Sequence, residues 1–576
     1  MKSILIANRG EIAVRVIRTA RELVMRTIAI YSELDRDARH VQLADEAWFV
    51  GPAPAAESYL NQERILQIAR EAKAESIHPG YGFLSENAGF ARRVKEAGLI
   101  WVGPPPEAIE GMGDKITSRR NAEKAGVPTV PGNTEPVATV DEVAKLAHEY
   151  GFPVAIKAAY GGGGKGLRVV RSVGELDEAF EGARREADAY FGNPEVYVEK
   201  YLENPRHVEA QIIFDTHGNG VFLGERDCSV QRRHQKLVEE TPSPGLNPRQ
   251  RRNLGRAALA AAKSCGYANA GTVEFLVDQS GEFYFLEMNT RLQVEHTVTE
   301  MVTGLDLVEW QIRVAYGEKL GFGDPEPSGH AIEFRINAED PYNGFLPTPG
   351  QVVEWVEPAG FGVRVDSWIT PGTTVSQYYD NLMAKLVVWG PTREAAIARG
   401  RRALEEFKVS GVATTIPAHL AVVDHPDFVA GKHHTKWMED AVDLGEAPPM
   451  VAPALPEDEA LVKRDITVEV GGRRFQVAYW APEASPTGQP RRRPPKLSPG
   501  GGGKASDGVV TAPMQGTIVK VHVKAGQAVT EGEPICVLEA MKMENEVKSP
   551  ATGEVVDLRV EPGDTVSSGQ VIAIVK

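Results

Sequence analysis

The sequence predicts an α/β multidomain protein that ends in a small all-β sandwich. Three observations lead to this fold class. A β-α-β pattern opens the chain, patterns typical of β-hairpins follow through its middle, and residues 508–576 contain an internal repeat. A chain of 576 residues has room for roughly three to five domains.

The N-terminal segment has a strand, a helix and a second strand in its first residues. A short apolar run at residues 3–7 precedes an amphipathic stretch at 11–23 and a second apolar run at 24–31. This order predicts a parallel sheet. The turn after the first strand has a single glycine, Gly10, so the dinucleotide-binding pattern GxGxxG is absent. We expect residues 1–113 to form an α/β domain that supports the functional site.

Composition excludes several classes of protein. The net charge of −15 argues against nucleic acid or an anionic membrane as the main partner. No apolar run reaches the ~18 residues of a membrane span, and the N-terminal apolar stretch is too short for a signal peptide. Cys228, Cys265 and Cys536 are widely spaced, which disfavours a disulfide framework or a zinc site. We therefore expect a cytoplasmic protein.

A glycine run between two strands predicts a phosphate-covering hairpin. The strands are at residues 152–157 and 167–170, with four consecutive glycines at 161–164 between them. A Walker loop would need Ser or Thr after the lysine that follows the glycines, but a glycine follows it. Bare backbone N–H groups can cover phosphate oxygens, and Lys157 and Lys115 add positive charge. The alternative is a floppy surface loop.

A second hairpin predicts a magnesium site. Its strands are at residues 272–276 and 283–289, and symmetry about the short loop places Glu274 opposite Glu287, with Asn289 on the same face. Two carboxylates and an amide oxygen suit Mg²⁺. The alternative is a solvent-exposed carboxylate pair. Apolar residues at both odd- and even-numbered positions argue against that alternative, because such positions point to opposite faces and therefore predict strands buried on both sides. They are Phe275, Leu276, Phe285 and Leu286.

The C-terminal repeat has a fixed offset of 37 residues and predicts two stacked β halves. The equivalent pairs are Val510 and Val547, Pro513 and Pro550, Gly516 and Gly553, Gly526 and Gly563, Val529 and Val566, and Gly532 and Gly569. The seam between the halves, residues 540–544, should form a hairpin turn. Its tip would display Lys542 between Met541 and Met543.

Three connecting segments are rich in turn formers or low in complexity. The loop at residues 78–87 is equally compatible with a structural and a functional role. Residues 446–483 contain a predicted β-hairpin at 466–480, which we interpret as a docking element for a partner subunit. The Pro-, Gly- and Arg-rich residues 484–507 cannot pack a core and are predicted to be a flexible linker.

Residues 539–543, Glu-Ala-Met-Lys-Met, resemble the biotin attachment site of biotin carboxyl carrier domains, and Ala512-Pro513-Met514 fits the entry to such a domain. The lipoyl carrier fold shares the repeat, but its lysine typically lacks the Met-Lys-Met setting. The resemblance implies covalent biotin on Lys542, attached by a biotin protein ligase.

Residues 1 to about 445 resemble the ATP-grasp family and, more narrowly, the biotin carboxylases. The motifs that carry this resemblance are at residues 199–203, 206–209, 224–236, 287–296 and 333–339. The implied layout is an N-terminal domain at 1–113, an ATP-grasp domain at 114–320 with a Gly-rich lid at about 130–203, an α+β C-terminal domain at 330–445 and a biotinyl/lipoyl-like carrier at 508–576.

The resemblance also implies the roles of individual residues. ATP would be held by Lys115, Lys157, Gly162, Gly163, Gly164, Glu199, Lys200, Leu202, His207, Gln231, His234, Lys236, Leu276 and Glu287. Mg²⁺ or Mn²⁺ would be held by Glu274, Glu287 and Asn289. Bicarbonate would contact Arg291, Gln293, Val294 and Glu295. The catalytic set would be Glu295 as the base and Arg335 beside the biotin enolate, with Arg291 and Lys236.

The implied reaction is ATP- and bicarbonate-dependent carboxylation of biotin through carboxyphosphate. No segment of the chain remains for a carboxyltransferase, so this layout is similar to the α subunit of an acyl-CoA carboxylase that works with a separate carboxyltransferase β subunit, as a homo-oligomer within an αβ complex. The alternatives are a subunit of a pyruvate carboxylase, another ATP-grasp ligase such as a carbamoyl-phosphate or peptide ligase, and a non-catalytic biotin carrier scaffold.

Overall fold

The computed structural model describes the backbone of residues 1–113, 115–133, 136–158, 167–191, 194–445, 461–470, 473–482, 508–513, 516–540, 543–566 and 569–576. These residues form two units, Met1–Gly445 and Glu446–Lys576, which we describe separately. No helix among them is long and apolar enough to cross a membrane.

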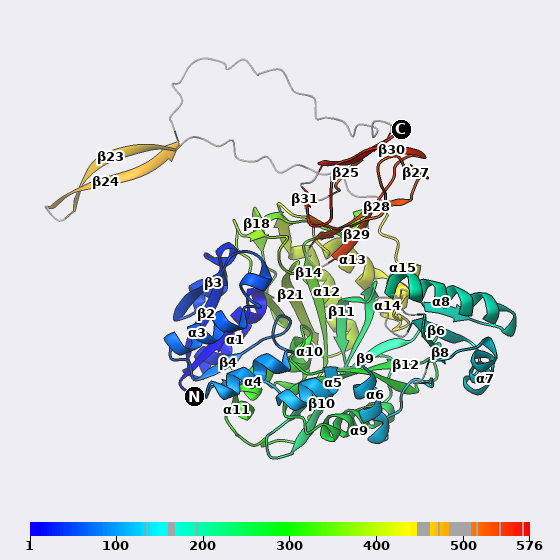
Figure 1. Cartoon of the computed structure of the whole chain (residues 1–576). Helices are drawn as coiled ribbons and strands as arrows, with labels where there is room; N and C mark the ends of the chain where they lie inside the picture. Colours follow the sequence, from blue (N-terminus) through cyan, green and yellow to red (C-terminus); the bar gives the residue numbers. More distant parts are fainter. Residues whose placement is uncertain are drawn as a thin grey trace. The chain divides into compact units, whose positions relative to one another are not determined.

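The first unit begins with a five-stranded parallel sheet, as the sequence predicts (Figure 1). Its strand order is β3-β2-β1-β4-β5, with the bounds Glu46–Gly51, Arg26–Ser32, Ser3–Ile6, Ser76–His78 and Ile100–Trp101. Helix α1, Gly10–Glu22, buries Ile12, Val16 and Ile17. The second strand begins two residues later than predicted, because Val24 takes a left-handed turn with φ 57° after the helix ends.

An eight-stranded sheet forms the centre of this unit. Its order is β13-β12-β9-β10-β11-β14-β21-β19, with the bounds Phe283–Asn289, Asn269–Val277, Arg206–Phe214, Gly220–Arg232, Gln235–Thr241, His330–Asn337, Leu382–Gly390 and Val363–Ser367. Helix α9, Pro248–Ser264, packs its apolar face on β9, β10 and β12. Since β11 pairs directly with β14, one sheet continues from residues 114–320 into residues 330–445.

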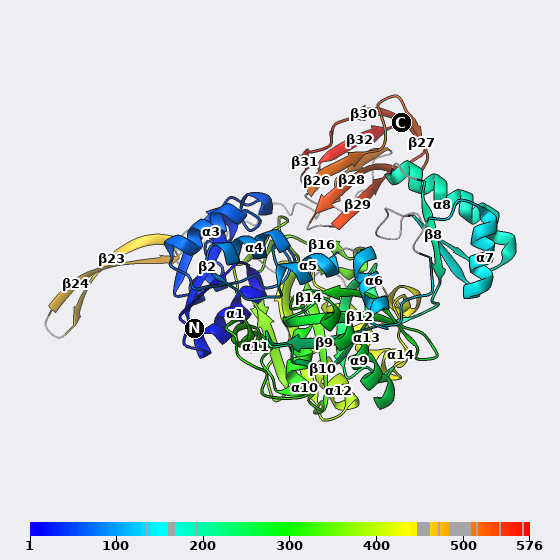
Figure 2. The same cartoon turned by 60° about the horizontal axis from the view of Figure 1, so that its bottom comes forward.

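A smaller lobe contains the predicted phosphate-covering hairpin. Strands β6, β7 and β8 (Val154–Ala158, Leu167–Val170 and Val196–Lys200) form an antiparallel sheet in the order β7-β6-β8. Helices α7 and α8, Val140–Tyr150 and Leu176–Phe191, cover it with an apolar core of their own (Figure 2). The strands flanking the glycine run therefore pair as predicted. The run itself, with Gly162, Gly163 and Gly164, lies outside the described residues.

The C-terminal module is the small all-β sandwich that the repeat predicts, but its two four-stranded sheets each combine strands from both halves of the repeat. One has the order β25-β32-β30-β27, with the bounds Val509–Thr511, Val571–Val575, Gly553–Leu558 and Ala528–Val529. The other has the order β29-β28-β26-β31, with the bounds Met543–Lys548, Pro534–Ala540, Gly516–Val521 and Thr565–Val566. An offset of 37 residues converts each strand of one sheet into its counterpart in the other.

Hydrogen bonds repeat at the same offset. The amide of Gly532 donates to the carbonyl of Ser549 at 2.9 Å, and that of Gly569 donates to the carbonyl of Ala512 at 2.8 Å. At the seam, β28 and β29 pair up to Ala540 and Met543, so only two residues separate the strands. These two, Met541 and Lys542, lie outside the described residues, as does the side chain of Met543.

The predicted hairpin between the two large parts of the chain is also present. Strand β23, Leu461–Val470, pairs with β24, Arg473–Pro482, through ten successive residue pairs. Residues 446–460 and the predicted linker at 484–507 lie outside the part of the chain that the structure describes.

Candidate active site

The predicted carboxylate pair is on adjacent strands. Glu274 of β12 lies directly opposite Glu287 of β13. Asn289, two residues further along β13, donates its amide to Oε1 of Glu274 at 2.8 Å, so all three side chains share one region. The expectation that β13 is buried on both faces is wrong for Leu286, which is 43% exposed. β13 is the outermost strand of the eight-stranded sheet.

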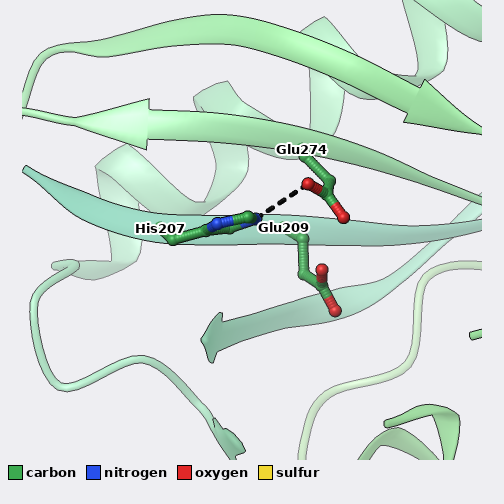
Figure 3. A group of neighbouring side chains, drawn as sticks. All are labelled: His207, Glu209 and Glu274. Carbon is green, nitrogen blue, oxygen red and sulfur yellow. Dashed lines mark ion pairs between the residues drawn. The ribbon is translucent and has the colours of Figure 1, made fainter. Parts of the chain in front are cut away.

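Glu274 belongs to a buried cluster with His207 and Glu209, which lie two residues apart on β9 (Figure 3). Nε2 of His207 is 2.9 Å from Oε2 of Glu274. Lys236 of β11 inserts its ammonium among the acidic residues, 2.6 Å from Glu209 and 3.0 Å from Glu274. Burial raises the pKa of Glu274, but Lys236 and His207 outweigh this effect and hold that pKa below its usual range.

Glu295 lies between two cations. It immediately precedes helix α10, His296–Thr303, and its side chain is 2% exposed. Its Oε1 is 2.7 Å from Nζ of Lys236, and its Oε2 is 2.9 Å from Nη2 of Arg335 on β14. Burial raises the pKa of Glu295, but Lys236 and Arg335 together lower it well below its usual range.

Arg226 of β10 connects this cluster to the next segment of the chain. Its side chain is fully buried and donates to Glu209, Gln211, Thr299, Thr272 and Gln293. Gln293 in turn donates to Oε1 of Glu274 at 2.8 Å. A buried guanidinium with five acceptors fixes the positions of all of them, so Arg226 sets the geometry of the site without being exposed to a ligand.

The predicted bicarbonate residues are close to the carboxylate pair. Arg291 donates to Oδ1 of Asn289 at 2.8 Å and is 3.0 Å from Glu86. The carbonyl of Val294 accepts from the buried Lys385 at 3.0 Å. Glu86 lies in the loop at residues 78–87, for which the sequence allowed either role, and it orients the arginine of the site.

Several of the predicted ATP residues are in the lobe or at its junction with the large sheet. Lys157 forms an ion pair with Glu199 across β6 and β8, and the ammonium of Lys200 donates to the carbonyls of Gly151 and Phe152 at 2.9 and 3.1 Å. Leu202 lies two residues beyond the end of β8. Glu199 and Lys200 are the last two residues of β8, and Lys157 on the neighbouring strand contacts the first of them.

The remaining predicted ATP residues are spread over the large sheet and one helix. Gln231 is buried near the end of β10, and His234 is exposed in the turn to β11 with φ 66°. Leu276 is half-buried on β12, two residues beyond Glu274. Lys115 is the first residue of helix α6, Lys115–Lys124, and its side chain lies outside the described part of the chain.

Sequence reasoning did not assign a role to Glu209, Arg226 or Glu86. Glu209 could have been found, because it follows His207 by two positions on a strand and must share its face. Arg226 and Glu86 gave no such signal, since their partners are distant in the sequence.

The donor set fits a divalent cation. Two opposed carboxylates and a nearby amide offer hard oxygen donors from adjacent strands. The three-residue group His207, Glu209 and Glu274 fits less well, because the ammonium of Lys236 contacts two of its carboxylates and supplies the charge that a metal would bring.

Family models match four successive parts of the chain. "Biotin carboxylase, N-terminal domain" matches residues 1–109, and "Carbamoyl-phosphate synthase L chain, ATP binding domain" matches residues 114–322. "Biotin carboxylase C-terminal domain" matches residues 333–440, and "Biotin-requiring enzyme" matches residues 508–575.

Whole-length relatives and solved structures agree with these matches. The biotin-dependent acyl-coenzyme A carboxylase alpha3 subunit of Mycobacterium leprae is 50% identical over 94% of this chain and 93% of its own length. The propionyl-CoA carboxylase alpha chain of Ruegeria pomeroyi is 41% identical over 95% of each chain. The biotin carboxylase domain of Hydrogenobacter thermophilus 2-oxoglutarate carboxylase, solved with MgADP and bicarbonate, is 50% identical, with TM-score 0.69 over 76% of this chain and 97% of that one.

Proposed function

The chain belongs to the biotin carboxylase family, as a carboxylase unit joined to a biotin carrier domain, and we propose that the buried carboxylates and cations described above perform its ATP- and bicarbonate-dependent carboxylation of biotin. The observation that carries this assignment of roles is the position of Glu295, buried between Lys236 and Arg335 and next to the predicted bicarbonate residues. Three of the four matched domains form the unit that would carboxylate biotin, and the fourth would carry the biotin.

Glu295 takes the proton of bicarbonate, and Arg291, Gln293 and the backbone of Val294 hold the anion. A carboxylate whose pKa is held far below its usual range is a poor base, so the site must release Glu295 before catalysis. Lys236 provides a route, because its ammonium is shared with two other carboxylates and can move to an incoming phosphate oxygen. Its departure would raise the basicity of Glu295 when ATP is bound.

ATP binds between the lobe and the large sheet. Lys157 and Lys236 supply positive charge for the phosphate oxygens, which lowers the cost of the charge that develops during phosphoryl transfer. Lys157 must first exchange its ion pair with Glu199 for a phosphate. Glu274, Glu287 and Asn289 would hold Mg²⁺ or Mn²⁺, which neutralises charge on the phosphates when bound. Gly162, Gly163 and Gly164 would cover the nucleotide as part of the lid.

Lys542 carries the biotin, which supplies the nitrogen that accepts the carboxyl group. The support is the register of β28 and β29, whose pairing ends at Ala540 and Met543 in a two-fold repeated module, on either side of the predicted attachment residue. We propose that a biotin protein ligase attaches the group.

The acceptor of the carboxyl group is an acyl-CoA, and a separate carboxyltransferase subunit binds it. The support is that relatives similar along 94–95% of this chain are acyl-CoA carboxylase α subunits. Hairpin β23–β24 serves as the docking element, since the described residues of each strand pair only with the other and a lone two-stranded ribbon is marginally stable. The carboxylase unit assembles as a homo-oligomer within this αβ complex.

The deciding experiment measures ADP release from purified protein with ATP, Mg²⁺ and bicarbonate, with and without free biotin. We expect release to require bicarbonate and to rise with biotin. Adding the carboxyltransferase subunit with acetyl-CoA, propionyl-CoA or pyruvate then identifies the acceptor. ADP release that ignores biotin would instead indicate a different ATP-grasp ligase, and ADP release that responds only to pyruvate would exclude the acyl-CoA assignment.

A further inference from the structure

Two glutamates with no role in the chemistry above face each other inside the large sheet. Glu239 of β11 and Glu333 of β14 are directly opposed in the antiparallel register, and each is 0% exposed. Opposed residues on adjacent strands have their Cβ atoms about 5 Å apart on one face of the sheet. Two carboxylates buried at this separation cannot both be charged without a large electrostatic cost.

Each carboxyl group has one satisfied and one unsatisfied oxygen. Oε1 of Glu239 accepts from Nε of Arg335 at 2.6 Å and lies 2.5 Å from its Nη2. Oε2 of Glu333 accepts from the hydroxyl of Thr297. Oε2 of Glu239 and Oε1 of Glu333 are buried with no hydrogen-bond partner among the described residues. One proton located between the two groups would satisfy both unpaired oxygens and remove one of the two charges.

The surrounding charges support the same conclusion. Burial raises the pKa of Glu239 to about 7, with Arg335 opposing the rise and Glu295 adding to it. Burial and then Glu239 raise the pKa of Glu333 well above its usual range, against the opposing effect of Lys385 on β21 and Arg335.

The other charged group facing the pair is Lys236 on β11, which lowers the pKa of Glu239 less than Arg335 does. These cations are already engaged elsewhere: Lys385 with Glu11, and Lys236 with three carboxylates. They cannot fully compensate a second negative charge on the pair.

We infer that Glu239 and Glu333 share one proton and that its loss to solvent controls how firmly Arg335 holds the base Glu295. With the proton present, the pair carries a single charge, and Arg335 is drawn more strongly to Glu295. When the proton leaves, a second charge competes for the guanidinium and raises the negative potential at Glu295. Both changes make Glu295 a stronger base, so Glu239 and Glu333 are positioning residues for the proposed function, on which this inference rests.

The test is the pH profile of bicarbonate-dependent ADP release with free biotin in Glu239→Gln and Glu333→Gln. Wild type should lose activity as pH falls through the titration of the pair. The side chain at position 239 is neutral at every pH in Glu239→Gln, so activity should be ~10-fold or more below wild type at alkaline pH. The fall in activity at low pH, called the acid limb below, should be absent from this variant. Glu333→Gln allows at most one charge on the pair, as in the protonated wild-type pair, so it should also lack the acid limb and stay below wild type at alkaline pH.

Glu240→Gln is the matched control, because Glu240 is buried on the same strand but pairs with His330 and Arg393. Its acid limb should coincide with that of wild type. Glu239→Asp restores the charge and should restore the limb. A purely structural role predicts lower activity at every pH with the limb unmoved in both Gln variants, and that result would overturn the inference. Biotin-dependent ADP release by wild type tests the proposed function separately.

Discussion

The ammonium of Lys236 lies 2.7 Å from Oε1 of Glu295 and thereby holds the proposed base in its charged, weakly basic form. The same ammonium is within 3.0 Å of Glu209 and Glu274. One lysine thus contacts three buried carboxylates before any substrate arrives. Arrival of a phosphate that attracts this lysine would link nucleotide binding to activation of the base.

Replacing Glu295 with Gln should lower bicarbonate-dependent ADP release by about 10²–10⁴-fold, the usual contribution of a general base. The amide keeps the size of the side chain but cannot take a proton. Affinity for ATP, measured by calorimetry, should change little. Glu309→Gln, a partly exposed ion-pair residue on a helix, is the control and should keep wild-type activity. A Glu295→Gln enzyme with normal turnover would remove Glu295 from the base role.

Replacing Lys542 with Ala should remove covalent biotin and abolish carboxylation of the acceptor with the carboxyltransferase subunit. ADP release stimulated by free biotin should remain, because the carboxylase unit is intact. Mass spectrometry of the purified chain measures the modification. Lys548→Ala is the matched control, since Lys548 is an exposed lysine at the far end of the same hairpin. Retention of biotin in Lys542→Ala would assign the attachment to another lysine.

Deleting residues 461–482 should abolish co-elution with the carboxyltransferase subunit and leave free-biotin activity unchanged. The hairpin of β23 and β24 is the proposed docking element. Deletion of residues 485–506 removes the same length of chain from the predicted linker and should preserve co-elution. If both deletion variants co-elute with the carboxyltransferase subunit, then docking must involve another surface of the chain.

The parts of the fold and site that the sequence could predict are those with short-range regularity. The repeat at offset 37 predicted one small β unit of two stacked halves, and the structure has two matching sheets. The predicted pairing of Glu274 with Glu287 is confirmed, although the strands reach it through a register shift between Glu274 and Phe275 and not through symmetry of the loop alone. The pairing of Glu239 with Glu333 gave no signal, because 94 positions separate them and only the folded register of β11 and β14 brings them together. Leu286 was misjudged for a related reason: its burial depends on which elements pack over each face of the assembled sheet.

Stability at acid pH offers a last test, through His78. This histidine is 0% exposed, and its Nδ1 accepts from the amide of Gly80 at 2.9 Å. Burial lowers its pKa to about 4, while Gln311 opposes the shift. The unfolded chain binds a proton at the ordinary value near 6.5, so the neutral histidine favours the folded state above pH 6.5. This contribution, about 3 kcal/mol, is lost as pH falls from 6.5 to 4.

As the pH is lowered from 6.5 to 4, we therefore expect the melting temperature of His78→Gln to fall less than that of wild type. At pH 7.5 the variant should be less stable by about 1–2 kcal/mol, because the bond from Gly80 is weakened. The gap should narrow or reverse at pH 4. His217→Gln alters an exposed histidine and should follow the wild-type curve. Parallel curves for wild type and His78→Gln would mean that His78 is not held neutral in the fold.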